Sequence, residues 1–383
     1  MQKDNEALIY LDHNATTPID PAAIEAMTHY MLHDFGNPSS PYILGVRARE
    51  GVESARREVA LLLGCKDSEV IFTSGGSESN NMSLKGLINF RNPAACHIIT
   101  SAVEHPAIIN PALYLMELGV NVTILPVDHF GRVNPDDVRK AIRPDTTLTS
   151  IMLANNEIGT LNPLEEISQI TRSYNVPLHT DAAQAVGKVP VDVNDLGVDL
   201  LSLAGHKVYG PKGVGALFIR EGLDLTPLVH GAGQEMGKRA GTENVILAAG
   251  LGAACRIARA RLKDDMLTIG SLRDRLQAAL FEGIKDLVLN GHPLERLPNT
   301  LSVSVPGIEG GMLLEGLPGL AASTGAACHD RSVKLSHVLS AVSLPPHIGM
   351  GTLRLSLGRG NDEQQIEEAA RQIIDRVRDM RDA

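Results

Sequence analysis

A histidine and a lysine stand together at the end of an apolar segment, and the lysine could carry out covalent chemistry. Residues 200–204 have the pattern of a buried strand, Gly205 permits a turn, and His206 and Lys207 follow. A lysine amine held in a cleft is desolvated, which lowers its pKa and favours the neutral form that attacks a carbonyl to form a Schiff base. A lone lysine is more often a solvated surface charge, so this interpretation depends on the residues that accompany Lys207.

Two further motifs supply complementary groups. Asp181 ends another apolar segment, and Gly76 and Ser77 follow the strand-like residues 70–72 at the start of a helical pattern. Pyridoxal phosphate chemistry requires a lysine in Schiff-base linkage and an acid that faces the pyridinium nitrogen. Backbone amides and hydroxyls at a helix start form a site for an anion such as the cofactor phosphate. The three motifs together favour a pyridoxal phosphate enzyme.

Five blocks of the chain resemble the signature motifs of cysteine desulfurases, and they follow one another in unbroken order along nearly the whole sequence. The blocks are residues 73–81, 154–159, 179–184, 205–213 and 354–359. Several long blocks in order are more specific than one short motif. The resemblance implies a class V aminotransferase-like enzyme of fold type I that uses pyridoxal phosphate. Some features, including Ala204 and residues 37–42, are also similar to selenocysteine lyases.

The resemblance also assigns residues to the cofactor. It implies that Lys207 is both the Schiff-base lysine and the catalytic base, that His105 stacks on the ring and assists proton transfer, and that Asp181 faces the ring nitrogen. From the residues alone, a histidine at a strand end is more often structural. The other implied cofactor contacts are Gly76, Ser77, Asn156, Gln184, His206 and, from a partner subunit, Thr242. A contribution from the partner implies a homodimer.

For the substrate, the resemblance points to Asn37 and Arg354, of which the arginine would hold the carboxylate in a bidentate pair. Turn chemistry alone explains Asn37 equally well. The chain also departs from the family. Ala204 stands where the family commonly has serine, which removes one hydroxyl donor to the phosphate, and Met236 stands where arginine is more frequent.

Among the four cysteines, Cys328 is the candidate nucleophile. The cysteines lie far apart without CxxC spacing, so the sequence predicts neither a metal site nor a disulfide framework. Cys328 stands in a segment of small and polar residues, where a thiol can ionise and move. The other three have the surroundings of buried bystanders. Cys328 also matches the family residue that forms a persulfide.

The elements that must position these residues alternate between apolar and amphipathic patterns, which predicts an α/β domain with a mainly parallel, seven-stranded sheet. Ligands of such sheets bind beyond the carboxyl ends of the strands, where the motifs above fall. No GxGxxG motif follows the first strand, so a dinucleotide-binding fold is disfavoured. The expected strands are residues 70–72, 97–100, 121–127, 148–153, 176–180, 200–204 and 215–219.

The C-terminal part has the pattern of a smaller α+β domain, with expected helices over 245–261, 266–284 and 362–380 and strands over 301–305 and 352–357. A helix is also expected over 21–32 near the N-terminus. The resemblance implies that the N-terminal strand joins the smaller domain. We therefore expect a large cofactor-binding domain over 15–260 and a small domain, formed by 1–14 and 261–383, that carries the Cys328 loop.

Composition limits the partners. The 383 residues carry a formal net charge of -10, which argues against nucleic acid or an anionic membrane as the main partner. The N-terminus lacks the pattern of a signal peptide, and no stretch approaches ~20 uninterrupted apolar residues. The sequence therefore predicts a cytoplasmic protein with a small substrate.

These observations predict conversion of L-cysteine to L-alanine, with a persulfide on Cys328 and delivery of its sulfur to an acceptor protein for iron–sulfur clusters or other thio-cofactors. The close alternative is a selenocysteine lyase that acts on L-selenocysteine. A transaminase with the same cofactor is a second alternative. A non-catalytic binding module of sulfur assembly is an alternative of a different class.

Overall fold

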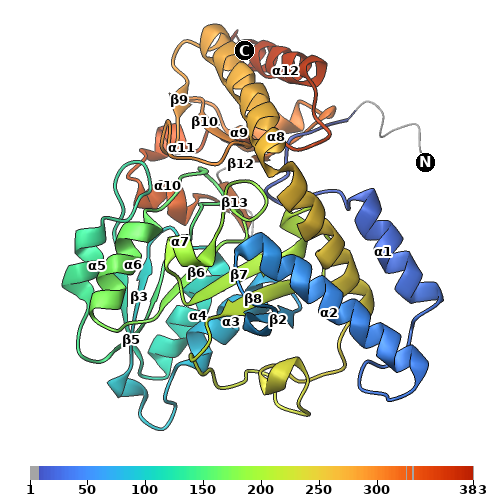
Figure 1. Ribbon diagram of the computed structural model, residues 1–383. Helices are drawn as coiled ribbons and strands as arrows, with labels where there is room; N and C mark the ends of the chain where they lie inside the picture. Colours follow the sequence, from blue (N-terminus) through green and yellow to red (C-terminus); the bar gives the residue numbers. More distant parts are fainter. Residues whose placement is uncertain (1–7, 325, 330–331, 383) are drawn as a thin grey trace.

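A seven-stranded sheet forms the centre of the computed structural model, which describes residues 8–324, 326–329 and 332–382, with the backbone alone for 326–329 and 332–334 (Figure 1). The strand order is β2-β8-β7-β6-β5-β3-β4, and β8 alone runs in the direction opposite to the other six strands. The predicted mainly parallel sheet is confirmed. The strands are β2 (Val70–Thr73), β3 (His97–Ser101), β4 (Asn121–Leu125), β5 (Thr146–Ser150), β6 (Leu178–Asp181), β7 (Leu200–Ala204) and β8 (Gly215–Ile219).

Helices cover both faces of this sheet. Val70 and Phe72 belong to one hydrophobic cluster and Ile71 to another, because successive side chains of a strand point to opposite faces. Helices α2 (Ile43–Leu63) and α8 (Val245–Gly283) contribute to the first cluster, and α3 (Gly76–Gly86) and α4 (Pro106–Glu117) to the second. Burial on both faces explains why these strands read as nearly continuous apolar runs.

A second sheet lies in the C-terminal part and has its own hydrophobic cluster. Its order is β12-β15-β10-β9, all antiparallel, and α12 (Glu363–Asp382) and the second half of α8 pack on it. The N-terminal β1 (Ile9–Tyr10) pairs in parallel with β11 (Leu320–Ala321) of the same part. The strands are β9 (Val288–Leu289), β10 (Thr300–Ser304), β12 (Ser323–Thr324) and β15 (Thr352–Ser356).

Helix α8 is one continuous helix of 39 residues, so the prediction of two helices over 245–261 and 266–284 was wrong. The residues between the two expected helices include no proline that would end a helix. Arg261 Nε lies 3.2 Å from Asp265 Oδ1, and this i,i+4 ion pair spans the position where the break was expected. The helix runs from the central sheet to α12 (Figure 1). The domain boundary expected near residue 260 falls inside α8, and the division into two domains stays a prediction.

The segment around Cys328 forms a hairpin in place of the expected loop. Strand β13 (Ala326–His329) pairs antiparallel with β14 (Ser332–Leu335), and Cys328 lies opposite Val333. A β-branched residue such as Val333 favours a strand, and the ladder satisfies backbone groups that a loop leaves to water. The position of the Cys328 thiol lies outside the described structure.

Among the remaining helices, α1 begins as predicted, with the Asp20 carboxylate accepting a hydrogen bond from the backbone N–H of Ala22 at 2.9 Å. These helices are α1 (Pro21–Leu32), α5 (Pro135–Ala141), α6 (Leu164–Ser173), α7 (Val193–Leu196), α9 (Gly310–Glu315), α10 (His337–Ala341) and α11 (Pro346–Gly349). Within the described residues, no helix is long and apolar enough to cross a membrane.

Candidate active site

A pocket of about 350 Å³ lies at the carboxyl ends of β6 and β7, where the sequence placed the site. Asp181 ends β6, while Lys207 follows β7 in a short 3-10 turn. Most of the predicted residues meet here although the chain separates them widely. The predicted residues that line the pocket are Gly76, Ser77, His105, Asn156, Asp181, Gln184, His206, Lys207 and Arg354.

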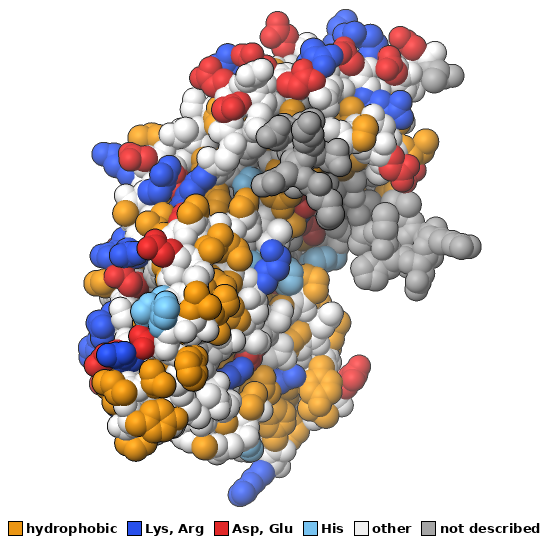
Figure 2. All heavy atoms as spheres, turned by 90° about the vertical axis from the view of Figure 1, so that its right-hand side faces the viewer, with side chains coloured by type: hydrophobic (Ala, Val, Ile, Leu, Met, Phe, Trp, Pro, Cys, Tyr) orange, Lys and Arg blue, Asp and Glu red, His pale blue; other side chains and the backbone are white. Residues whose placement is uncertain are grey.

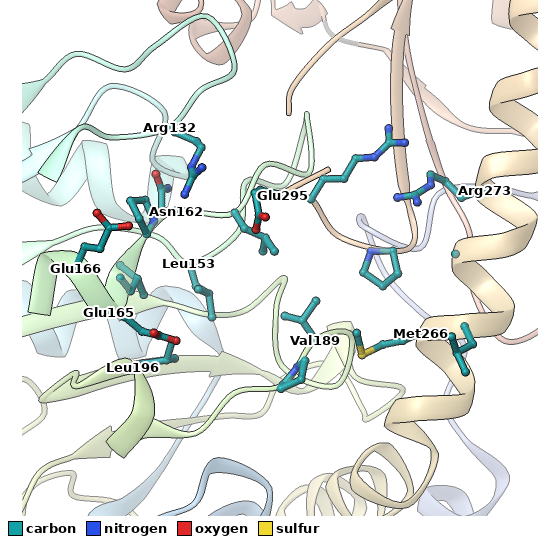
Figure 3. A pocket seen from close by; sticks show the side chains of 18 of the residues that line it. Arg132, Leu153, Asn162, Glu165, Glu166, Val189, Leu196, Met266, Arg273 and Glu295 are labelled. Carbon is teal, nitrogen blue, oxygen red and sulfur yellow. The ribbon is translucent and has the colours of Figure 1, made fainter. Parts of the chain in front are cut away.

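A larger hollow of about 860 Å³ lies between α6 and α8 (Figure 3). Arg273 and Met266 project into it from α8, and Glu165 and Glu166 come from α6. None of the predicted cofactor or substrate residues lines this hollow. The convergence of complementary groups, and not the volume, therefore identifies the smaller pocket as the candidate active site.

The Lys207 amine is held by two backbone carbonyls. Its Nζ donates to the Asn14 oxygen and, at 2.7 Å, to the Ala15 oxygen. Burial, together with the positive charge of Arg354, lowers the pKa of Lys207 to about 8. A far larger share of this amine is neutral near pH 7 than for an ordinary lysine, which suits it to attack a carbonyl carbon or to accept a proton.

The Asp181 carboxylate has a fixed orientation. Asn80 Nδ2 donates to its Oδ2 at 2.7 Å, and the backbone N–H of Ala183 donates to its Oδ1 at 3.0 Å. Sequence reasoning missed Asn80, which is almost fully buried. The signal was present, because Asn80 follows Gly76 by four residues on α3 and therefore lies on the same helix face.

His105 combines a structural and a site role in one side chain. Its Nδ1 accepts the backbone N–H of Ala107 at 3.1 Å and so caps α4, while its ring lines the pocket. An Nδ1 that accepts leaves the proton of the neutral ring on Nε2. Burial lowers the pKa of His105, although the carboxylate of Asp181 opposes this shift.

The start of α3 gives the pocket an anion-binding end. Gly76 and Ser77 are its first residues, and the first N–H groups of a helix have no partner within it. The residue before them, Gly75, has φ +146°, a conformation that side-chain-bearing residues rarely adopt. Across from Gly76 lies Ala204, which offers no hydroxyl, and burial lowers the pKa of His206 to about 4, so its ring is neutral.

Arg354 is held on one side and leaves one donor free. Its Nη2 donates to Asp12 Oδ1 at 2.8 Å and to Ser323 Oγ at 2.9 Å. Its Nη1 donates to the backbone oxygen of Asn156 at 3.1 Å. The Nε of Arg354 and the Oδ1 of Asn156 are buried without a partner. Such atoms cost about 1–3 kcal/mol each, which bound ligand groups would recover. The donor set therefore fits pyridoxal phosphate together with a carboxylate substrate.

Three predicted residues do not line the pocket of the single chain. Asn37 is exposed, and its Oδ1 accepts the backbone N–H of Ser39 at 2.9 Å, as in an ordinary turn. Thr242 borders a different pocket with Glu243. The thiol of Cys328 lies outside the described structure. Met236, the second departure from the family pattern, is exposed with φ +56°.

Comparison with known proteins identifies the family. Residues 9–368 match the model of the family described as aminotransferase class-V. A protein from Methanosarcina thermophila named cysteine desulfurase IscS is 46% identical over 382 residues, covering 98% of this chain and 94% of its own length. The chain belongs to the aminotransferase class-V family, among its cysteine desulfurases. The family resemblance drawn from the sequence motifs is confirmed, and the chain is a pyridoxal-phosphate-dependent enzyme by family.

Other relatives extend this similarity. The human cysteine desulfurase is 40% identical over 377 residues, covering 98% of this chain and 82% of its own length. A solved structure titled NifS-like protein has 36% identity and a TM-score of 0.91, covering 97% of this chain and 99% of its own. A second, titled SspA in complex with cysteine, has 35% identity and a TM-score of 0.81, covering 91% and 98%. The predicted fold type is confirmed.

Proposed function

We propose that this protein is a cysteine desulfurase that converts L-cysteine to L-alanine, forms a persulfide on Cys328 and passes the sulfur to an acceptor protein. The observation that carries the proposal is the convergence of Lys207, Asp181 and Arg354 on one pocket. The solved relative with bound cysteine supports cysteine as the substrate.

Pyridoxal phosphate would lie between the start of α3 and the Lys207 amine. The backbone N–H groups of Gly76 and Ser77 would bind its phosphate. Asp181 would keep a proton on the ring nitrogen, and His105 would lie against the ring. Asn156, Gln184 and His206 would contact its polar groups. When bound, the cofactor supplies an electron sink for the negative charge that develops at the substrate Cα.

The substrate would be oriented by its carboxylate. The free Nε of Arg354 offers one donor to the carboxylate, and the adjacent Nη2, which already contacts Asp12 and Ser323, would share a donor to complete the pair. With the carboxylate held there, Lys207 Nζ takes the proton from Cα, for which a lowered pKa is required. Asn37 is proposed as a further substrate contact in the assembled protein.

Sulfur transfer is assigned to Cys328. Its thiolate Sγ attacks the sulfur of the substrate, so an S–S bond forms while the Cβ–S bond breaks. Cβ then takes up a proton and Cα regains the proton that Lys207 removed, which gives alanine. The persulfide stays on Cys328 until a thiol of the acceptor protein attacks its outer sulfur.

The deciding experiment measures alanine and sulfide from L-cysteine, and alanine and selenide from L-selenocysteine, with wild-type protein and Cys328→Ala. A desulfurase loses the cysteine reaction in the variant. Equal cysteine turnover in both proteins contradicts the proposal. A wild-type protein that acts on selenocysteine alone supports the selenocysteine lyase, for which Ala204 and residues 37–42 are the supporting observations.

The active unit is proposed to be a homodimer in which Thr242 of one chain completes the phosphate site of the other. Thr242 lies outside the pocket of its own chain. Large hydrophobic side chains are exposed on and after α1, namely Ile24, Met31, Leu32 and Phe35. Figure 2, which views the molecule from the side where α1 lies in Figure 1, shows hydrophobic side chains gathered on the lower part of this face. Sedimentation should give twice the chain mass of 40.9 kDa.

Arg354→Ala is expected to raise the KM for cysteine about 100-fold, because a charge-assisted bidentate contact contributes roughly 3 kcal/mol. Binding of the cofactor should change less than threefold, since the guanidinium is assigned to the substrate alone. Steady-state kinetics and cofactor titration measure the two effects. Arg359→Ala provides a control, because Arg359 forms ion pairs with Asp20 and Asp265 outside the pocket. An unchanged KM in Arg354→Ala contradicts the assignment.

The lowered pKa of Lys207 predicts how the cofactor-free protein reacts with added pyridoxal phosphate. Only the neutral amine attacks the aldehyde, and with a pKa of about 8 roughly one amine in ten is neutral at pH 7, against about one in three thousand at the ordinary lysine value. The rate of covalent attachment should therefore rise about tenfold per pH unit and level off above about pH 8. Stopped-flow absorbance follows it. A rate that still rises tenfold per unit beyond pH 9 rules out the lowered pKa.

A further inference from the structure

Asn14, from the turn after β1, is a buried centre of hydrogen bonds behind the pocket. Its backbone oxygen accepts from Lys207 Nζ and, at 2.9 Å, from Gln184 Nε2. Its side-chain Oδ1 accepts from Lys188 Nζ at 3.1 Å and from Asn299 Nδ2 at 3.0 Å. One residue of the N-terminal segment therefore contacts both the proposed catalytic lysine and a second lysine that the mechanism does not use.

The second lysine, Lys188, has an unusual environment. Its Nζ donates to Gln184 Oε1 at 2.8 Å as well as to Asn14 Oδ1, so both of its partners are neutral amide oxygens. Within the described residues, no carboxylate forms an ion pair with it. Burial lowers the pKa of Lys188 well below the ordinary value, and the positive charges of Lys207 and Arg354 lower it further. A neutral amine has two N–H donors, which match these two oxygens.

This arrangement determines how the amide of Gln184 is turned. An amine N–H needs an acceptor, so the atom of Gln184 that faces Lys188 is the oxygen and the atom that faces the Asn14 carbonyl is the nitrogen. The amide nitrogen carries two hydrogens, and Asn14 accepts one of them. Gln184 also lines the pocket, which leaves the second N–H for a ligand there.

We propose that Lys188 is a positioning residue, which locks the Gln184 amide with its Nε2 toward the pocket so that it donates to the ring oxygen of the bound cofactor. This inference rests on the function proposed above. Without Lys188, only the Asn14 carbonyl orients the amide, so the amide more often presents its oxygen to the oxygen of the cofactor, which is repulsive. The lowered pKa of Lys188 reduces the positive charge that it places beside the pocket.

The test is the pH titration of the visible absorption band in purified holoenzyme, for wild type, Lys188→Met, Gln184→Leu and the double variant. A donor on the ring oxygen favours the deprotonated state of the chromophore, so its loss in Lys188→Met should raise the titration midpoint by roughly half to one pH unit. Cofactor content should be unchanged, and the KM for cysteine should stay within about twofold because Arg354 is not contacted. In the Gln184→Leu background, Lys188→Met should cause no further shift.

An unmoved midpoint in Lys188→Met overturns the proposal, and so does an equal shift in both backgrounds. Asn299→Ala is the matched control, since it removes the other donor to Asn14 Oδ1 and leaves Gln184 untouched. A midpoint shift in Asn299→Ala as large as that in Lys188→Met also overturns the proposal. If Lys188→Met does not fold, Lys188→Gln takes its place. The glutamine side chain is one atom too short to reach both Gln184 Oε1 and Asn14 Oδ1, so this variant must show the same rise of the titration midpoint. Wild-type protein that forms no visible band with pyridoxal phosphate contradicts the proposed function instead.

Discussion

Lys207→Ala should lose cysteine turnover by about four orders of magnitude or more, because one substitution removes both the covalent anchor of the cofactor and the general base. Its amine is held at the pocket by the carbonyls of Asn14 and Ala15. The side chain contributes little to the hydrophobic core, so we expect the variant to fold. Residual activity near the wild-type level removes Lys207 from the mechanism.

Borohydride reduction followed by peptide mass spectrometry tests the covalent anchor directly. Wild-type protein should carry the reduced cofactor on the peptide that contains Lys207, and the variant should carry none. Lys212→Ala is the matched control, because Lys212 lies five residues further along the chain and is exposed. A reducible link that persists in Lys207→Ala places the anchor on another lysine.

Cys328→Ser should abolish conversion of cysteine to alanine while cofactor binding stays intact. A serine hydroxyl is a far weaker nucleophile toward sulfur than a thiolate, so no acceptor for the substrate sulfur remains. With selenocysteine, we expect part of the activity to survive, because selenium is the better leaving group. Mass spectrometry of wild-type protein after incubation with cysteine should find added sulfur on the Cys328 peptide.

The other cysteines provide the controls. Burial raises the pKa of the Cys65 thiol to about 12 and raises that of Cys255 further, which keeps both thiols protonated and inert. Cys96 is also buried. Cys65→Ser should therefore retain wild-type turnover within about twofold. Added sulfur on the peptide of Cys65, Cys96 or Cys255, with none on Cys328, assigns the nucleophile elsewhere.

Much of the fold could be predicted from local pattern. Each expected strand of the central sheet forms within a few residues of its predicted bounds, because buried strands are continuous apolar runs between turns. The prediction of a helix break near residue 262 was wrong. The ion pair between Arg261 and Asp265, and the packing of α8 against two hydrophobic clusters, stabilise one continuous helix. Tertiary contacts override local preference where that preference is weak.

The sequence by itself determined the chemical groups: the lysine after β7, the aspartate at the end of β6 and the glycine-rich helix start, since each motif is contiguous. Only the tertiary structure decided which groups surround them. Asn14 meets Lys207 across 193 positions and Lys188 across 174, and no local pattern encodes such contacts. Burial, which sets the lowered pKa values of Lys207 and Lys188, likewise depends on packing of distant segments. The residues define the chemistry, and the fold sets their protonation and orientation because desolvation and hydrogen bonding act through space.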